Sequence, residues 1–212
     1  MTRLGVFGGT FDPIHNGHLR MAEEARERFA LDKVLLVPNA VSPFKTDRNV
    51  TPGQLRAEMI RRAIADNSFF ALDTREIERP APSYTVETLR ALKAEHPHAD
   101  LFFLTGTDAV RGLPGWHAPQ ELLALAQFIA AARPGVQERD VLAALPSTWE
   151  ARVLFLPMPE LDISSTDLRA RARDGRSLRY LTPHVVEGFV REQGLYLPIR
   201  DPEANSFAGE IS

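Results

Sequence analysis

The N-terminal segment LGVFGGTFDPIHNGH, residues 4–18, most constrains what this chain can fold into. A short apolar run stops at Gly8 and Gly9, and a helical pattern of apolar residues begins beside His15 and His18. Glycines at a strand end let backbone approach a ligand closely, and N–H groups that open a helix point toward bound anions. The segment therefore predicts a strand, a turn and a helix that together bind phosphate groups.

Two other phosphate-binding motifs do not match this segment. No third glycine stands at the offset of the dinucleotide fingerprint. The segment also lacks the Gly-Lys-Ser/Thr that ends a Walker A loop. A single histidine near a helix start is usually a surface cap. Here, a glycine pair and two histidines all lie within eleven residues, which favours a role of the histidine side chains as donors to a phosphate.

Apolar runs alternate with helical patterns along the chain, which is typical of βαβ units and a parallel sheet. We expect strands over residues 3–7, 33–38, 69–72, 100–105, 127–132 and 152–156. We expect the longer helices over residues 18–29, 53–66, 83–95, 164–173 and from 183 to just before 194. With right-handed crossovers, this order predicts an α/β fold with a doubly wound, Rossmann-like parallel sheet. Residues 1–197 would form one domain with a small C-terminal helical part, and residues 198–212 a flexible tail.

The predicted topology also predicts where a ligand binds. Doubly wound sheets bind ligands outside the carboxyl ends of their strands. The first strand is followed by Gly8, and the fourth is followed by Gly106 and Asp108. We expect these glycines and polar residues to face one crevice.

The composition excludes several classes of protein. The 212 residues carry a net charge of −3, which argues against a general nucleic-acid binder. The absence of cysteine excludes disulfides and thiolate metal sites. No apolar run approaches a membrane span and no secretory signal is evident, so we expect a cytoplasmic protein without a membrane partner. A homo-oligomer is left open.

Three motifs resemble those of one enzyme family. GGTFDPIHNGH is similar to the HxGH signature of a nucleotidyltransferase superfamily, and ISSTDLR at residues 163–169 is similar to its ISSTxxR element. PSYTVETL at residues 82–89, together with Trp116, resembles bacterial nicotinate-nucleotide adenylyltransferases, and the resemblance spans about residues 4–196. It implies transfer of AMP from ATP to nicotinate mononucleotide, with deamido-NAD and pyrophosphate as products.

The resemblance implies that His15, His18 and Arg169 are catalytic and act on the ATP phosphates. The residues that it implies for ATP binding are Gly8, Gly9, Thr10, Phe11, Gly106, Asp108, Ile163, Ser164, Ser165 and Thr166. Asp108 would accept ribose hydroxyls, with a helix cap as its alternative role. Magnesium is expected to arrive with ATP, and Asp12 either orders the turn before Pro13 or also helps to hold the ion.

The residues implied for acceptor binding are Lys45, Tyr84, Thr85, Trp116 and Arg133. Trp116 would stack on the pyridine ring, and the amides of Tyr84 and Thr85 would receive the nicotinate carboxylate. Lys45 would reach a phosphate, and Arg133 would complete the acceptor pocket. The chain departs from the family where Phe44 replaces a frequent histidine, and where Gly-Thr-Asp replaces a frequent Gly-Ala-Asp.

Other functions stay open at this point. The chain has no cysteine nucleophile and no evident Ser-His-Asp order, which fits direct displacement on phosphorus. One alternative is an adenylyltransferase of the same superfamily that acts on nicotinamide mononucleotide or phosphopantetheine. Another is a catalytically silent, nucleotide-binding regulatory module, which the intact His15, His18 and Arg169 disfavour. The choice between nicotinate and nicotinamide nucleotides is not settled by any spacing.

Overall fold

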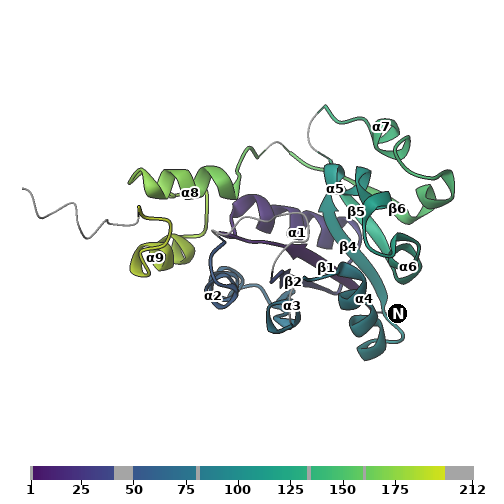
Figure 1. Cartoon of the computed structure of the whole chain (residues 1–212), viewed down its shortest axis with the longest axis horizontal. Helices are drawn as coiled ribbons and strands as arrows, with labels where there is room; N and C mark the ends of the chain where they lie inside the picture. The colour runs from purple at the N-terminus through teal and green to yellow at the C-terminus, as the bar shows by residue number, and fades with distance from the viewer. Residues whose placement is uncertain (1, 41–49, 80–81, 133–134, 160, 199–212) are drawn as a thin grey trace, which may run out of the picture.

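The computed structural model describes residues 2–40, 50–79, 82–132, 135–159 and 161–198. At its centre lies a six-stranded parallel sheet with the order β3-β2-β1-β4-β5-β6 (Figure 1). The strands are β1 (Arg3–Gly9), β2 (Lys33–Pro38), β3 (Phe70–Leu72), β4 (Asp100–Gly106), β5 (Ala126–Ala132) and β6 (Val153–Pro157). This order confirms the predicted doubly wound α/β fold, in which β1 and β4 meet at the point where the strand order reverses.

Helices cover both faces of the sheet. They are α1 (Asn16–Arg28), α2 (Gly53–Ala63), α3 (Arg75–Glu78), α4 (Thr85–Glu95), α5 (Thr107–Arg111), α6 (Pro119–Leu125), α7 (Glu138–Leu142), α8 (Ser165–Arg173) and α9 (His184–Glu192). Two 3₁₀ turns, η1 (Leu113–Gly115) and η2 (Ser147–Arg152), complete the set in the described residues. The five longer helices match the predicted ones, whereas the short α3, α5, α6 and α7 are too brief to give a clear helical period.

Successive side chains of each central strand enter two different cores, as a strand period of two requires. On β4, Phe102 and Leu104 belong to one core cluster with residues of α1, α2 and α9, whereas Leu101 and Phe103 belong to another with residues of α4, α5 and α6. All four side chains are buried. The strand is therefore apolar throughout, which is why its sequence shows a continuous hydrophobic run.

The expectation that the first strand stops before the glycine pair is wrong. Gly8 pairs with Val37 and Gly9 with Pro38, so β1 continues along β2 for two further residues. A Cβ on Gly9 would lie 2.9 Å from the ring of Phe11, so this glycine makes room for that buried ring. The glycines thus allow close packing of the following turn while they remain part of the sheet.

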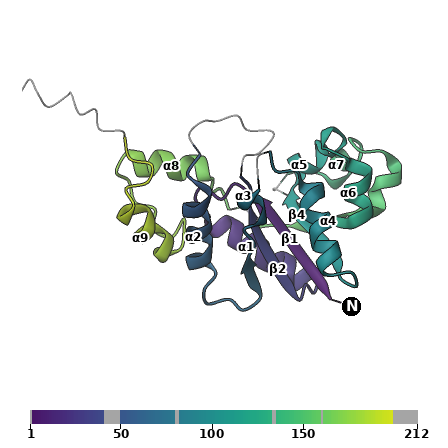
Figure 2. The ribbon, with the colours of Figure 1, turned by 60° about the horizontal axis from the view of Figure 1, so that its bottom comes forward.

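The C-terminal helices return to the N-terminal turn. Figures 1 and 2 place α8 and α9 at one end of the molecule, beyond α2, and α5 to α7 at the other end. The Thr182 hydroxyl donates to the Ile14 carbonyl at 2.8 Å, and the Asn16 N–H donates to the Leu181 carbonyl at 3.0 Å. Most of the predicted tail, residues 199–212, lies outside the described residues. No helix in the described part of the chain is long and apolar enough to cross a membrane.

Candidate active site

His15 and His18 cap the N-terminus of α1 for each other. The His18 N–H donates to Nδ1 of His15, and the His15 N–H donates to Nδ1 of His18, each at 3.3 Å. The two rings stack with centroids 3.6 Å apart and an interplanar angle of 22°. A nitrogen that accepts a hydrogen bond carries no hydrogen, so the neutral form of either imidazole carries its hydrogen on Nε2. The cap therefore fixes the tautomer of both histidines.

His15 is uncharged at neutral pH. The residue is 5% exposed, and burial lowers the pKa of its imidazole to about 4. The start of a helix carries a partial positive charge, which also disfavours a charged imidazole there. His15 therefore offers a neutral N–H donor whose hydrogen stays on Nε2 over the physiological pH range.

The ISSTDLR segment lies against the turn that leads into α1, although more than 150 residues separate the two in sequence. Ser164 caps α8 by accepting the Asp167 N–H at 3.2 Å. The Ser165 hydroxyl donates to the Pro13 carbonyl at 3.0 Å. Arg169 donates to the Asp12 carbonyl at 2.8 Å and to the Thr166 hydroxyl at 3.3 Å. The N-termini of α1 and α8 and the Arg169 guanidinium thus gather at one turn.

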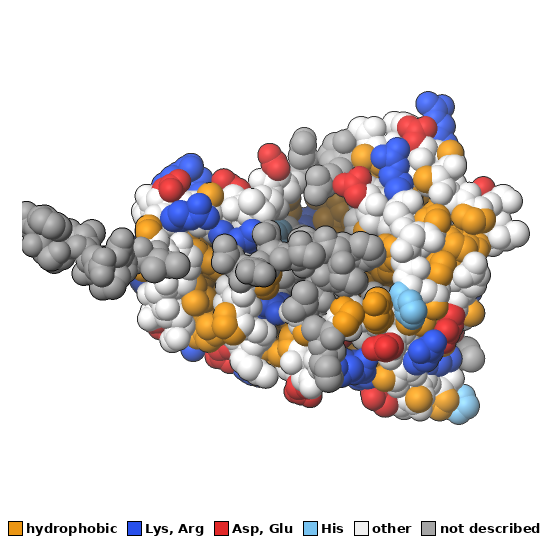
Figure 3. All heavy atoms as spheres, in the orientation of Figure 1, with side chains coloured by type: hydrophobic (Ala, Val, Ile, Leu, Met, Phe, Trp, Pro, Cys, Tyr) orange, Lys and Arg blue, Asp and Glu red, His pale blue; other side chains and the backbone are white. Residues whose placement is uncertain are grey.

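In Figure 3 this face of the molecule is hollowed beside α8, and basic and histidine side chains lie at the hollow. Ile163 lies near the start of α1, because a Cβ on Gly17 would be 3.9 Å from its Cβ. The predicted phosphate-binding residues of the two motifs are therefore neighbours in space.

Asp12 orders the turn. Its carboxylate accepts the Thr51 N–H at 3.1 Å and the Tyr196 hydroxyl at 2.6 Å, and the residue is 2% exposed. No group of three His, Cys, Asp or Glu residues in the described ranges could hold a metal ion. Of the two roles expected for Asp12, the geometry supports the ordering of the turn. The second role, a contact with magnesium, stays a prediction.

Arg56 is a site residue that sequence reasoning missed. It is 1% exposed, and its guanidinium donates to the carbonyls of Thr51, Thr10 and Asn39 at 2.7–2.8 Å. These carbonyls belong to the ends of the loops that follow β1 and β2. An arginine within a helix normally faces water, so nothing in the sequence pattern pointed to its burial.

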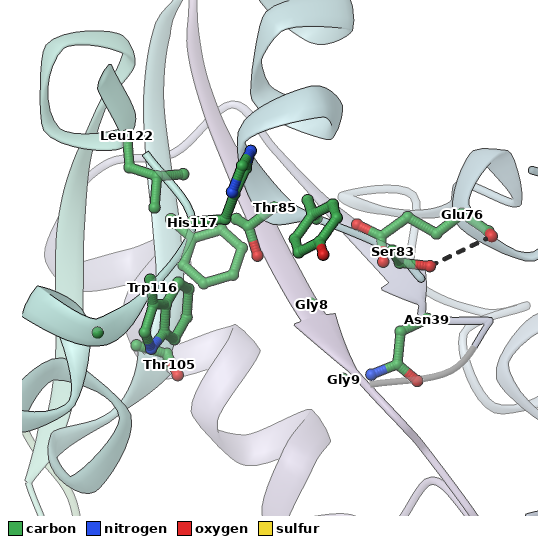
Figure 4. A pocket seen from close by; sticks show the side chains of 13 residues that line it. Gly8, Gly9, Asn39, Glu76, Ser83, Thr85, Thr105, Trp116, His117 and Leu122 are labelled. Atoms are coloured by element: carbon green, nitrogen blue, oxygen red, sulfur yellow. Dashed lines mark hydrogen bonds between the residues drawn. The ribbon is translucent and has the colours of Figure 1, made fainter. Parts of the chain in front are cut away.

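A cavity of about 430 Å³ opens at the carboxyl ends of β1 and β4 (Figure 4). Its lining residues are Gly8, Gly9, Asn39, Glu76, Ser83, Tyr84, Thr85, Phe103, Thr105, Gly115, Trp116, His117 and Leu122. The cavity brings the glycine pair together with Tyr84, Thr85 and Trp116, which the resemblance assigned to the acceptor. Asn39, Glu76 and His117 are lining residues that the sequence analysis did not single out.

Trp116 and the start of α4 both line this cavity. The Trp116 indole is half-buried and meets Phe103 and Phe128 edge-on, with ring centroids 6.0 Å and 6.2 Å away. The helix expected from residue 83 begins at Thr85: Tyr84 holds the N-cap position, and its side chain makes no capping hydrogen bond. The Ser83 hydroxyl instead accepts the Ala40 N–H at 3.2 Å.

His15, His18 and Arg169 do not line this cavity. Phe11 joins the two regions: its ring lies against Gly9 and edge-on to His18, with centroids 5.1 Å apart. The candidate site therefore consists of two adjoining regions, the turn that carries His15 and His18 and the cavity.

The remaining predicted residues fall into two groups. Asp108 is exposed in the first turn of α5. Gly106, not Asp108, holds the N-cap position of this helix, so the alternative role of Asp108 as a helix cap is wrong. Lys45 and Arg133, together with the departure at Phe44, lie outside the described residues.

The fold and the histidine-capped turn define a nucleotidyltransferase, and a family model described as cytidylyltransferase-like matches residues 6–171. Two proteins that carry the name "Probable nicotinate-nucleotide adenylyltransferase" are similar over nearly the whole chain. The Desulfitobacterium hafniense (strain DSM 10664 / DCB-2) protein is 44% identical over 200 residues, 92% of this chain and 95% of that protein. The Geobacter sulfurreducens protein is 41% identical over 211 residues, which cover 92% of this chain and 98% of that protein.

The structure of Plasmodium falciparum nicotinic acid mononucleotide adenylyltransferase complexed with NaAD shares the fold. Its TM-score is 0.75 at 18% identity, with 92% of this chain and 98% of that chain covered. The chain therefore belongs to the cytidylyltransferase-like family and, within it, to the nicotinate-nucleotide adenylyltransferases.

Proposed function

We propose that this enzyme transfers AMP from ATP to nicotinate mononucleotide and releases deamido-NAD and pyrophosphate, as a step of NAD biosynthesis. The observation that carries the proposal is the position of Arg169 at the same turn as His15 and His18. The adjoining cavity, which contains Trp116, supports a second nucleotide beside the first. Family membership supports the reaction class.

The reaction needs no covalent intermediate. A phosphate oxygen of the acceptor attacks the α-phosphorus of ATP in line and forms a new P–O bond. The bond from that phosphorus to the oxygen that bridges to the β-phosphate breaks, and its electron pair leaves with pyrophosphate. Catalysis of such a step consists mainly of positioning and of charge stabilisation by donors that are already in place.

The phosphate-binding turn supplies those donors. The Nε2–H groups of His15 and His18 would donate to ATP phosphate oxygens, and the Arg169 guanidinium would offset their negative charge. The N–H groups that open α1 and α8 add fixed positive ends of helix dipoles. Magnesium would enter as part of the MgATP substrate and would offset charge on the departing pyrophosphate.

The cavity supplies the acceptor contacts. The Trp116 indole would stack on the pyridine ring, and the N–H groups at the start of α4 would receive the carboxylate. Tyr84, the N-cap residue of α4, makes no side-chain hydrogen bond to the first amides of this helix. A carboxylate at a helix N-terminus is also favoured by the helix dipole.

A substrate panel tests this function. Purified protein with ATP and magnesium is offered nicotinate mononucleotide, nicotinamide mononucleotide or phosphopantetheine, and pyrophosphate release is measured. The proposal expects the highest kcat/KM with nicotinate mononucleotide. Release only with phosphopantetheine, or none with any acceptor, would refute it.

A further inference from the structure

Glu76 places a buried carboxyl group at the acceptor cavity. It lies on α3, is 7% exposed, and lines the cavity with Ser83 and Tyr84. The Thr88 hydroxyl on α4 donates to its Oε1 at 2.6 Å. Figure 4 shows Glu76 and Ser83 on the side of the cavity opposite Trp116 and His117. None of the steps proposed for adenylyl transfer uses this carboxyl group.

Glu76 also connects the elements that frame the cavity. Its carbonyl accepts the Ser83 hydroxyl at 3.5 Å, and the oxygen of Ser83 accepts the Ala40 N–H at 3.2 Å. Its carboxyl reaches Thr88 in the second turn of α4. The residue thus lies between the end of β2 and the N-terminus of α4, where the acceptor carboxylate would bind.

The surroundings of Glu76 favour its neutral form. Burial raises the pKa of this carboxyl, and the charge of Asp73 acts in the same direction. The upward shift of the Glu76 pKa is opposed, but not cancelled, by hydrogen bonds with the Thr88 and Ser83 hydroxyls and by the charge of Arg79. His117 is a further titratable group on the cavity wall. An anionic ligand in the same cavity would add a like charge and raise the pKa of Glu76 further.

The two pyridine nucleotides differ at the group that would enter this part of the cavity. Nicotinate mononucleotide presents a carboxylate there, and nicotinamide mononucleotide presents a neutral amide. An ionised Glu76 would repel the carboxylate and accept a hydrogen bond from the amide. A neutral Glu76 would donate its own hydrogen to the carboxylate, while the Thr88 hydroxyl still donates to the other oxygen.

We propose that Glu76 determines acceptor specificity by proton uptake: its carboxyl becomes protonated when a carboxylate-bearing nucleotide occupies the cavity and then donates a hydrogen bond to that nucleotide. This inference rests on the proposed function, since it concerns the choice between two acceptors of that reaction. A protonated glutamate and a glutamine have nearly the same shape. E76Q therefore mimics the neutral form permanently, and its amide oxygen can still accept the Thr88 hydroxyl.

The test measures kcat/KM for both acceptors between about pH 6 and about pH 8.5, in the wild type, in E76Q and in E78Q. The ratio of the two values cancels pH effects that both acceptors share, including titration of the nucleotide phosphate. In the wild type, the ratio of kcat/KM for the nicotinate nucleotide to kcat/KM for the nicotinamide nucleotide should fall with rising pH. Above the pKa of Glu76, this ratio should decrease by about tenfold per pH unit. In E76Q the ratio should be independent of pH. E78Q removes the same charge from an exposed residue of α3 and should behave like the wild type.

The outcomes separate the two proposals. No pyrophosphate release with either nucleotide would refute the proposed function itself. Activity with a wild-type ratio that does not change with pH would refute the role of Glu76. The same slope in E76Q as in the wild type would assign the linked proton to another group, such as His117, and would equally overturn the inference.

Discussion

The Arg169 guanidinium donates a hydrogen bond to the Asp12 carbonyl at 2.8 Å, across 157 positions of sequence. Its second nitrogen donates to the Thr166 hydroxyl on the preceding turn of α8. One side chain thus holds α8 against the turn that positions His15. The Ser165 hydroxyl, which donates to the Pro13 carbonyl, is a second contact between α8 and the same turn.

Replacement of Arg169 should reduce turnover through both its charge and its geometry. R169A should lower kcat by about 10²-fold, and R169K should recover only part of the loss, because an ammonium lacks the planar fork that reaches two acceptors. Steady-state pyrophosphate release measures both variants. R173A changes an exposed arginine of the same helix and should leave kcat unchanged. Full activity of R169K would show that charge alone is needed.

Loss of the His18 side chain should affect chemistry more than folding. H18A should lower kcat by at least about 10²-fold, since one donor to the transition state is removed. Circular dichroism should show an intact fold. H184A, at an exposed histidine on α9, is the control. Normal turnover in H18A would remove the mechanism proposed here.

Trp116 should matter for one substrate and not for the other. W116A should raise the KM of the acceptor nucleotide by about tenfold or more, as expected from lost stacking, with little change in the KM of ATP. W149A removes the second tryptophan, which does not line the cavity, and should leave both values unchanged. If W116A weakened both substrates equally, the stacking assignment would be wrong.

The neutral state of His15 should appear as a pH dependence of stability. The folded pKa is about 4 and the ordinary value is 6.5, so the unfolded chain binds a proton between these values that the folded chain does not. The free energy of unfolding should therefore fall as the pH decreases from 6.5 toward 4, and His15 should contribute no slope above 6.5. Urea unfolding at several pH values measures this. H15N keeps a capping side chain and should show a smaller slope. An identical slope would contradict the assignment.

Tyr196 should stabilise the N-terminal turn from the far end of the described chain. Y196F leaves one oxygen of the buried Asp12 carboxylate without its 2.6 Å donor. The free energy of unfolding should fall by about 1–3 kcal/mol, the usual effect of a buried polar atom that loses its partner. Y180F, at a tyrosine that is 89% exposed, should change it by less than about 0.5 kcal/mol. Equal stability of the two variants would refute the role of Tyr196.

The central strands could be predicted because they are buried on both faces and so appear as apolar runs. The main error concerned β1, since glycines usually end a strand, whereas Gly8 and Gly9 keep their pairing with β2. The HxGH and ISSTxxR motifs likewise predicted which residues meet at the turn. Their mutual geometry depends on hydrogen bonds to distant carbonyls, which no local pattern encodes.

The residues that were missed have a common physical reason. Arg56 and Glu76 are buried and Tyr196 is half-buried, and each makes hydrogen bonds to residues outside its own element. In a helical pattern, a charged residue is normally assigned to the solvent side. Only the tertiary structure shows that Arg56 faces the backbone of two loop ends.

The last strand of the sheet ends at Pro157, whereas the bonds that close the N-terminal turn come from Ser165, Arg169, Thr182 and Tyr196. A chain that is still emerging from the ribosome can thus complete its sheet before these groups are available. The contacts that α8 makes with the N-terminal turn are then missing. A nascent or prematurely truncated chain would therefore carry both histidines without Arg169 beside them. Assembly of the site in this way follows the synthesis of residues 165–196.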